Sequence, residues 1–543
     1  MGLTNVMDDI FYENKDFRYD HRVFRHPSYV KDKHIFYHLS REDDGSLQFS
    51  MNRKGQYIMS PRRLAEICIY RLVCEIQVMQ KMAVKYLPSN IYPIMLTEAM
   101  YQREAHAMEW LVSTWPMKTL RVYDILPPED FLEEDYLTRP MEEGNPTTPS
   151  DCFMTGLLKL RPVSRLKVID FTGFEKDRKL CKELCRLPIL WLKPKYRTVD
   201  HIHESMCSTI DVSKDKVQRF INRISNVYQN IDEEFKHGNK IGTITVKTVL
   251  HITIDDVPLG LSLQKHSPFK FSADKVWIKH IPEVTLPLPA LNSVIDAARI
   301  THFEYEDPLL PRDAGKFQSL TEGMIPLRNL VSFSVPNSID VQINAEMVTE
   351  LNSVLKNLKH LQRLNFAYCN LQGSISKLLA GIRQRICYLN LKDVRLTEED
   401  IHFLLHWRPL SNVRELNLSC NNLSNLYPHV VAMMERMSRI TCIGLSYCQL
   451  NTHAAVVIMR ATKECSRLKV ITLQNYVPLP LKDVLEMLHL CTQVSSMQKV
   501  ILFPEIYAYP GNTDEERRLN RIHMYRSCCR YLSMKSRADI ELE

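Results

Sequence analysis

The residues best suited to chemistry in this sequence are histidines and cysteines at short spacing. His201 and His203 stand two residues apart, and Cys181 and Cys185 stand four apart. A structural zinc site needs four such ligands, usually supplied as two close pairs. No second Cys or His cluster complements His201 and His203, and the helical spacing of Cys181 and Cys185 favours buried packing. We therefore expect no metal site and no cofactor.

The motifs of the common enzyme classes are also missing from the sequence. It contains no Walker phosphate loop, no G-x-S-x-G, no H-E-x-x-H and no C-x-x-C pair. Glycine, which phosphate-binding loops require, is scarce at 15 residues in 543. The sequence therefore predicts a protein that is not an enzyme and that binds no small molecule.

The amino-acid composition narrows the class of protein further. Apolar residues make up 45% of the chain and charged residues 24%, which are globular values. The net charge of 70 − 63 = +7 is mild for 543 residues, and no Lys/Arg run is long enough to predict direct nucleic-acid binding. The N-terminus lacks a secretory signal pattern, and no apolar stretch reaches the ~18 residues that span a membrane. We expect a protein of the cytoplasm or nucleus, with its 15 cysteines reduced.

An internal repeat dominates the second half of the chain. Segments such as "LQRLNFAYCNL" and "VRELNLSCNNL" fit the leucine-rich-repeat pattern L-x-x-L-x-L-x-x-N/C-x-L. Copies begin at 361, 386, 413, 440 and 468, with a weaker one at 497, so that successive starts are 25, 27, 27, 28 and 29 residues apart. The residues expected to form the repeat framework are Leu361, Leu364, Phe366, Cys369, Leu416, Leu418, Asn421, Ile443, Leu445 and Cys448.

This repeat pattern defines a fold class. The x-L-x-L core of each copy predicts a short strand whose leucines point to one face. The Asn or Cys that follows can satisfy backbone groups left free where the strand ends. The stretch after the second copy predicts a helix capped by Thr397, with Asp400 at its third position. A strand and a helix in each repeat predict an α/β leucine-rich-repeat horseshoe, a solenoid with parallel strands on its concave side.

Fainter copies extend the array upstream. Strands are predicted near Leu330, Val249 and Leu166, and a helix over 212–242. We divide the chain into an N-terminal extension (1–58), extended or partly disordered, a helical region (59–125), and a connecting loop with a first helix (126–160). The repeats follow over 161–505, clearest over 361–502, and a C-terminal cap covers 506–543.

One helix ahead of the repeats carries a spacing suited to docking. In "SPRRLAEICIYRL", Ser60 is a good N-cap and Pro61 suits the first helical position. Leu64, Cys68 and Leu72 then recur every four residues, which places them on one face. Such a stripe either caps the first repeat of the horseshoe or docks into another protein. Both roles are compatible if different faces serve them.

Three segments in this order resemble the start of the PRAME (preferentially expressed antigen in melanoma) family. They are "SPRRLAEICIYRLV", "LPSNIYPIMLTEAM" and "STWPMKTL". "RLKVIDFTGF" and the ending "KVILFPEIYAYPGN…RIHMYRSCCRYL" are similar to later landmarks of the same family. The resemblance covers about 59–540, weakly in the middle.

The resemblance implies a role in ubiquitin ligation. Family members look like substrate receptors of cullin-2 ligases, and their N-terminal box binds the elongin B/C adaptor. Leu64, Cys68 and Leu72 match that box, in which Leu64 fills a pocket on elongin C and the small Cys68 lets two helices approach closely. Leu87, Pro88 and Ile91 match the start of a cullin-contacting box, whose remainder is loose here. The family is also associated with repression of transcription and with the control of differentiation and apoptosis in germline or embryonic cells.

The sequence thus predicts a substrate-recognition adaptor whose partners are elongin B/C, cullin-2 and an unidentified target protein held on the repeats. A scaffold or inhibitor that binds a signalling protein without ubiquitin transfer is the main alternative. A nucleic-acid-binding repressor is a third, weaker one, since no concentrated basic surface is evident.

Overall fold

The computed structural model describes most of the chain after residue 46. The described residues are 47–51, 57–61, 64–75, 80, 87–125, 137–141, 147–174, 177–192, 243–252, 261, 264, 267–279, 295–476, 478–504, 506–511 and 513–543. The predicted helix over 212–242 and the His201–His203 pair lie outside these residues.

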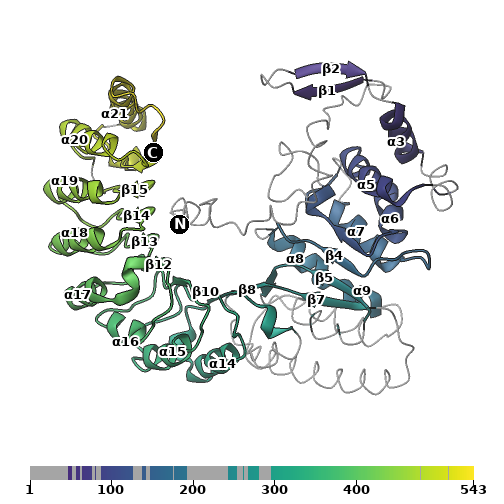
Figure 1. Ribbon diagram of the computed structural model, residues 1–543, viewed down its shortest axis with the longest axis horizontal. Coiled ribbons are helices and arrows are strands. Elements are labelled where there is room, and N and C mark those ends of the chain that lie inside the picture. Colours follow the sequence, from purple (N-terminus) through teal and green to yellow (C-terminus); the bar gives the residue numbers. More distant parts are fainter. Residues whose placement is uncertain are drawn as a thin grey trace.

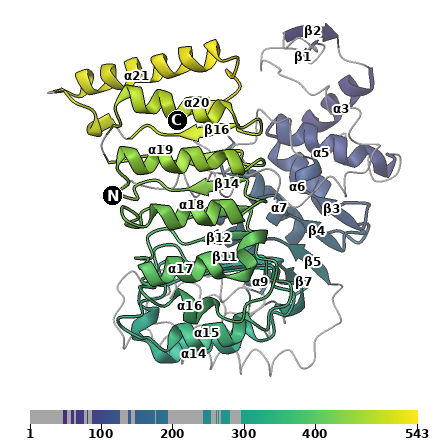
Figure 2. The same ribbon diagram turned by 60° about the vertical axis from the view of Figure 1, so that its left-hand side comes forward.

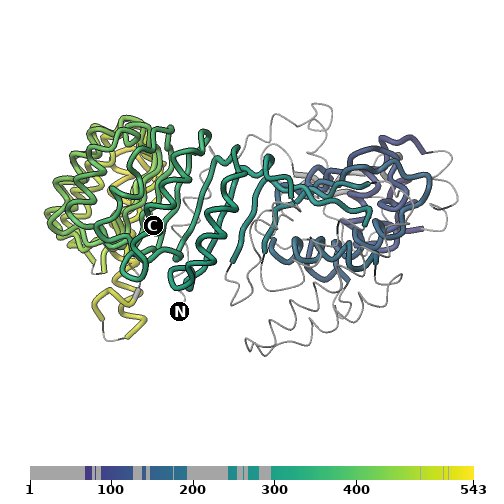
Figure 3. Tube along the Cα trace, turned by 90° about the horizontal axis from the view of Figure 1, so that it is seen from below, coloured from purple at the N-terminus to yellow at the C-terminus, as the bar shows by residue number. Residues whose placement is uncertain are grey.

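A long parallel sheet runs along the inner side of an arch, with helices along its outer side (Figure 1). Eleven strands pair in the order β17-β16-β15-β14-β13-β12-β11-β10-β9-β8-β6. Figure 3 shows the same chain from below, with the C-terminal repeats and the N-terminal region at opposite ends. The predicted leucine-rich-repeat horseshoe is therefore confirmed.

All six predicted repeats contain the expected strand. Neighbouring strands pair in parallel, with equivalent repeat positions opposite each other, so that Leu364 faces Leu389 and Leu389 faces Leu416. The bounds are β11 Arg363–Asn365, β12 Tyr388–Asn390, β13 Glu415–Asn417, β14 Cys442–Gly444, β15 Val470–Thr472 and β16 Lys499–Ile501.

The sheet continues in both directions beyond these repeats. Upstream lie β10 (Ser332–Ser334), as predicted near Leu330, and then β9 (His302–Glu306), β8 (Lys275–Lys279) and β6 (Leu250–Ile252). Downstream, β17 (Glu541–Leu542) pairs with β16. The sequence did not reveal β8, β9 or β17.

A second sheet of four parallel strands extends the array toward the N-terminus. Its order is β3 (Thr119–Arg121), β4 (Val168–Asp170), β5 (Ile244–Lys247) and β7 (Phe269–Ser272). The strand predicted near Leu166 is β4. Two residues separate β5 from β6 and two separate β7 from β8, while β5 pairs with β7 and β6 with β8. Two adjacent segments thus pass from one sheet to the other, so the array is continuous.

The helices of the clear repeats form the outer layer (Figure 2). The predicted cap of one of them is confirmed, since the Thr397 side chain and the Asp400 carboxylate form a reciprocal capping box. The bounds are α14 Ala314–Met324, α15 Met347–Leu355, α16 Ile375–Leu379, α17 Glu398–His406, α18 Tyr427–Arg436, α19 Thr452–Ala461 and α20 Leu481–Thr492.

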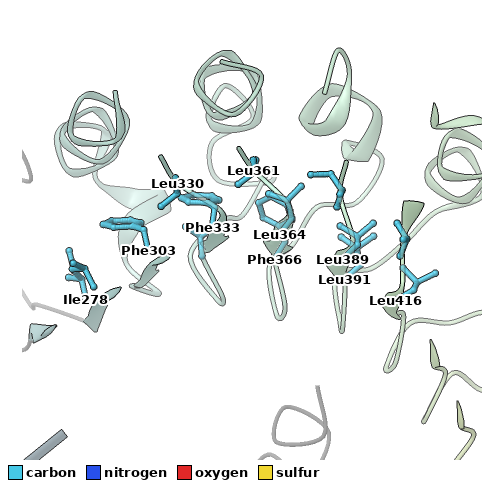
Figure 4. Packing of buried hydrophobic residues seen from close by; sticks show 14 of the residues in the cluster. Ile278, Phe303, Leu330, Phe333, Leu361, Leu364, Phe366, Leu389, Leu391 and Leu416 are labelled. Atoms are coloured by element: carbon cyan, nitrogen blue, oxygen red, sulfur yellow. The ribbon is translucent and has the colours of Figure 1, made fainter. Parts of the chain in front are cut away.

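The core lies between strands and helices as a row of equivalent side chains (Figure 4). Leu361, Leu364 and Phe366 are fully buried in one repeat, and the equivalent residues of the next repeats continue the row. Phe303 and Phe333 stack with their ring centroids 6.3 Å apart where the upstream repeats join it. Since burying such a side chain contributes about 1.5–3 kcal/mol, this row is the main source of stability.

Where a repeat carries Asn or Cys at the N/C position of the repeat pattern, that side chain bonds to backbone groups at the strand end, as the pattern predicted. Asn421 is buried, and its Oδ1 accepts from the backbone N–H groups of Val394 (3.1 Å) and Leu396 (3.2 Å). Its Nδ2 donates to the carbonyls of Leu391 (2.8 Å) and Leu418 (2.9 Å). A cysteine at this position forms fewer hydrogen bonds than Asn421 does. The Sγ of Cys448 lies 3.3 Å from the Leu418 carbonyl oxygen.

The residue before this position adopts left-handed backbone in five consecutive repeats. The φ angles lie between 52° and 62° at Asn337, Tyr368, Asp393, Cys420 and Tyr447. Side chains other than glycine rarely adopt this conformation, which the surrounding repeat must impose. The turn aligns these five side chains along one edge of the sheet.

The N-terminal region is helical, but it does not begin as predicted. Tyr57–Pro61 forms β2, which pairs antiparallel with β1 (Leu47–Met51), so Ser60 faces Gln48 and does not cap a helix. The helix α3 begins at Leu64 instead and spans Leu64–Cys74. The hairpin crosses the expected boundary at residue 58. Tyr57 and Ile58 favour strand, which outweighs the capping signal of Ser60 and Pro61.

The remaining N-terminal helices pack between α3 and the second sheet. The first helix expected within 126–160 is α7, which begins at Pro149 because Thr148 and Asp151 form a capping box. The bounds are α5 Tyr92–Tyr101, α6 Ala105–Ser113, α7 Pro149–Leu158, α8 Arg178–Cys185 and α9 Leu187–Leu192, with 3₁₀ turns η4 Ser89–Ile91 and η5 Tyr123–Ile125.

The predicted C-terminal cap is one long helix, α21 (Asp514–Met534), which packs on α20 and on the 3₁₀ turn η12 (Ile506–Ala508). Shorter 3₁₀ turns punctuate the repeats at η8 Ala297–Arg299, η9 Leu310–Arg312, η10 Arg408–Asn412 and η11 Thr462–Glu464.

We predict that Asn421→Ala lowers the free energy of unfolding by about 2–4 kcal/mol, because it leaves buried backbone groups of two repeats without a hydrogen bond. Urea unfolding followed by circular dichroism measures this change. The neighbouring Asn422→Ala is the matched control, since Asn422 is exposed and bonds only locally to Ser424. A loss for Asn421→Ala no larger than for Asn422→Ala would contradict the role of this side chain in the ladder.

Candidate functional site

The helix α3 has two different faces. Val73 is fully buried, and Ile69 and Leu72 are half-buried against the same core. Cys68 and Arg71 are exposed. The face that bears Cys68 therefore points away from the protein, while the face that bears Val73 attaches the helix to it.

The three residues of the predicted docking box, Leu64, Cys68 and Leu72, do not all lie on the exposed face. Leu64 is the first residue of α3, and its side chain lies outside the described part of the structure. Cys68 is exposed as docking requires, whereas Leu72 lies at the border and partly contacts the core. The helical spacing is thus present, and both roles considered for this helix are compatible with the burial of its side chains.

Buried aromatic side chains pack beneath α3. This helix rests on α5, whose Tyr92 is buried between two tryptophans, with ring centroids 6.4 Å from Trp110 and 6.3 Å from Trp115. Aromatic contacts of this kind add about 0.5–1.5 kcal/mol to the burial energy. The box helix therefore sits on an ordered base.

The residues of the cullin-box-like element lie next to the same base. Pro88 is exposed and precedes η4, which leads directly into α5. Leu87 and Ile91 are half-buried against the core. Since α3 and η4 both contact α5, the two elements flank one helix.

A charged cluster spans three repeats on the concave side of the sheet. Arg363, Tyr388 and Glu415 occupy the same position of β11, β12 and β13, so the strand register places them in one row. The Arg363 Cζ lies 4.0 Å from the centre of the Tyr388 ring, and its Nη2 lies 3.7 Å from Oε2 of the fully buried Glu415.

The surroundings of this row are apolar, which strengthens its charge interactions. Cys442 continues the row after Glu415 and packs with Tyr388. Burial, with the Glu415 charge added, raises the pKa of the Cys442 thiol. Low polarity around an ion pair makes it both strong and costly to break.

Tyrosines mark the edge of the sheet where the left-handed turns lie. Tyr368 and Tyr476 are exposed, and Tyr447 lies 5.0 Å from Tyr476 between ring centroids. The Lys392 Nζ lies 4.9 Å from the centre of the Tyr368 ring. Tyr507 follows in the next repeat and is 65% exposed. Tyrosine and arginine are the side chains that dominate binding energy at protein interfaces.

A shallow hollow of about 460 Å³ opens at the same edge, beside Tyr368. Its walls are Leu309, Ile343 and the polar side chains of Arg312 and Arg395. Leu309 and Ile343 are exposed, although apolar. The edge thus combines apolar, aromatic and charged groups.

The cysteines predicted to be structural are buried. Cys181 and Cys185 pack in the core as expected, and Sγ of Cys181 accepts a hydrogen bond from the His251 backbone N–H (3.1 Å). Burial raises the pKa of the Cys369 thiol to about 11 and that of the Cys448 thiol to about 12. These thiols stay protonated and inert at neutral pH.

The described residues show neither a metal-binding cluster nor a membrane-spanning helix. Among them, no three His, Cys, Asp or Glu side chains lie grouped so that they could hold a metal ion. None of the described helices is long and apolar enough to cross a membrane.

The charged row and the tyrosine edge were not identified from the sequence. The sequence signal for these features lies in the residues that flank each inward leucine. Successive side chains of a strand point to opposite faces, so these residues point to the concave side. Aligning the repeats would have placed Arg363, Tyr388 and Glu415 in one column. Their contacts with each other depend on the strand register.

Comparison with known proteins agrees with this architecture. Residues 310–505 match the PRAME C-terminal domain. Leucine-rich repeat-containing protein 14 of Xenopus laevis is 22% identical over 492 residues, which cover 83% of this chain and 88% of that protein. Preferentially expressed antigen in melanoma-like protein 1 of Mus musculus is 24% identical over 170 residues, which cover 31% of this chain and 37% of that protein.

Solved structures are more distant. The Toll–Spätzle complex of Drosophila is 14% identical with a TM-score of 0.29, and the match covers 50% of this chain and 32% of that one. The TLR13–ssRNA13 complex is 14% identical with a TM-score of 0.26, over 51% of this chain and 37% of that one. A similarity this low carries no argument about function.

The sheet and the matching domain define this chain as a leucine-rich-repeat protein. Its resemblance to the PRAME family is confirmed by the match over 310–505 and by the relatives from frog and mouse. Fold and family together support a protein-binding role.

We predict that Arg363 and Glu415 are energetically coupled. Arg363→Met should destabilise the protein by about 3 kcal/mol, because it removes a cation beside a buried carboxylate. Arg363→Met combined with Glu415→Leu should recover at least about 1 kcal/mol of that loss in a double-mutant cycle. Additive effects of the two substitutions in urea unfolding would contradict the coupling.

We also predict that a maleimide labels Cys68 within minutes in the folded protein, since the thiol is exposed. Cys369, Cys448 and Cys491 should remain unlabelled until the protein unfolds, because they are buried and their pKa values are raised to between about 11 and about 12. Peptide mass spectrometry after timed labelling distinguishes these sites. Protection of Cys68 would show that its face of α3 is covered.

Proposed function

We propose that the protein is the substrate-recognition subunit of a cullin-2 ubiquitin ligase that is recruited through elongin B/C. The observation that carries this proposal is the division of α3 into a core face and an exposed face that bears Cys68. A helix used only to cap the repeats needs the first face alone.

The geometry of α3 suits helix docking. A partner groove reads side chains at i, i+4 and i+8, the spacing of Leu64, Cys68 and Leu72. The small exposed Cys68 allows close approach of a second helix. Because α3 contacts α5 and joins the core through Val73 and Ile69, docking on its exposed face would require no rearrangement of the core.

The leucine-rich repeats supply the second half of the proposed function. The edge around Tyr368 and Tyr476 offers exposed aromatic side chains of the kind that anchor protein partners, whereas Tyr388 and Glu415 of the charged row are buried. A target held there would be brought near the catalytic subunits of the ligase, which act through proximity. The chain itself performs no chemistry in this proposal, and it works in the cytoplasm or nucleus.

We predict that the purified full-length protein retains elongin B/C in a pulldown, and that Cys68→Asp abolishes retention. An aspartate there would place a charge in an apolar contact, which costs several kcal/mol and weakens binding more than about 100-fold. Leu64→Asp should act in the same way.

The matched control is Cys74→Asp, an identical substitution at another exposed cysteine of α3, on a different face of the helix. It should bind like the wild type. Equal retention of the Cys68→Asp and wild-type proteins would overturn the adaptor proposal. Failure of the folded wild type to bind would favour a scaffold or inhibitor that acts without ubiquitin transfer.

A further inference from the structure

The outermost helix at the C-terminal end of the arch, α21, uses few of its residues for packing. Only Cys528 and Leu532 of its 21 residues are buried, with Tyr525 touching Phe503 at 5.7 Å between ring centroids. Figures 1 and 2 place α21 beyond α20, as the last layer of the described repeats. Met524, Cys529 and Tyr531 are partly buried on the same side, and the side of the helix opposite Cys528 is exposed.

The opposite face of α21 carries a strip of exposed side chains. Leu519, His523, Arg526, Arg530 and Met534 follow one another at intervals of four, three, four and four residues, which places them on one side of the helix. Leu519 is 54% and Met534 is 82% exposed. We call these five residues the α21 strip. It has apolar ends about 22 Å apart and a basic centre.

From Arg517 to Met534, the charged side chains of α21 are all positive. Five arginines occur between Arg517 and Arg530, and no Asp or Glu lies between Arg517 and Met534. Arg517 pairs with Asp514 in the first turn. Among the described residues, Arg518, Arg526 and Arg530 form no ion pair, and Arg526 and Arg530 are like charges four residues apart, an arrangement that disfavours the helix.

A contribution to helix stability does not explain why arginines stand at these positions. The helix dipole favours cations only in the last turn, and the last turn of α21 contains no basic residue. Packing does not explain them either, because both Arg526 and Arg530 are exposed. By contrast, Arg537 just beyond the helix has a structural role, since it donates to the carbonyls of Val494 and Met497.

We propose that the α21 strip binds an acidic helical segment of a partner protein. The basic centre requires carboxylates opposite Arg526 and Arg530, and the exposed Leu519 and Met534 require apolar residues four turns apart. A nucleic acid would satisfy the arginines but would leave the two apolar side chains in water. This inference does not depend on the ligase proposal, because α21 lies at the other end of the arch from α3 (Figure 1).

The test uses the full-length protein and a fluorescent helical peptide of about 21 residues, the length of α21. The peptide carries four Glu at the centre of one face and Leu at both ends of that face. We expect anisotropy to report binding that weakens with salt, because exposed charges contribute. The doubly substituted Arg526→Glu/Arg530→Glu protein should bind at least about tenfold more weakly.

Charge exchange makes the test specific. A second peptide with Lys in place of each Glu should bind the Arg526→Glu/Arg530→Glu protein and not the wild type. Leu519→Ser should weaken binding of the Glu peptide without changing its salt dependence. The matched control is Arg383→Glu/Arg385→Glu, which reverses two exposed arginines ahead of β12 and should leave binding unchanged.

Three outcomes would overturn the proposal. Absence of Glu-peptide binding to the wild type would reduce the strip to a solvated surface. Equal binding by the Arg526→Glu/Arg530→Glu and control proteins would place the contact elsewhere. Tighter binding of a short RNA duplex than of the Glu peptide would assign the arginines to a nucleic acid.

Discussion

The whole structure depends on the parallel pairing of short strands that each turn one large apolar side chain toward the helices. A strand of three residues has too little surface to be stable alone, so each repeat is held by its neighbours. Asn421 shows how closely neighbours are joined, since one buried side chain bonds to backbone groups of two successive repeats. The repeated left-handed turn beside this position then fixes the edge of the sheet.

The same pairing decides which distant residues meet. Arg363, Tyr388 and Glu415 are separated by about one repeat each in the sequence, yet the strand register sets them side by side. Because the strands are fixed by the core behind them, the exposed Tyr368 and Tyr476 at the sheet edge would need little reordering to meet a partner. A rigid frame of this kind lowers the entropy cost of binding.

The array from Leu361 onward could be predicted because each copy repeats the same apolar spacing. The strands β8 and β9 could not, since "KVWIK" and "HFEYE" alternate like ordinary strands and lack the L-x-L signal. The start of α3 was mispredicted because the pairing of Ser60 with Gln48 depends on a segment distant from the helix signal. At the sites, the spacing of Leu64, Cys68 and Leu72 was readable, but the exposure of Cys68 and the burial of Val73 required the tertiary packing.

The ends of a solenoid are where its sequence is least constrained, and both ends here carry an unusual helix. An internal repeat helix is flanked on two sides, whereas α3 and α21 are each packed by one narrow face, through Val73 at one end and through Cys528 and Leu532 at the other. Natural caps present a polar, solvated surface to water. The exposed face of α3 and the α21 strip instead mix small, apolar and unpaired basic side chains, which cost solubility or helix stability without return in the free protein. Under the two proposals made above, a partner bound at each end would recover that cost, and the arch would link proteins held at its two ends.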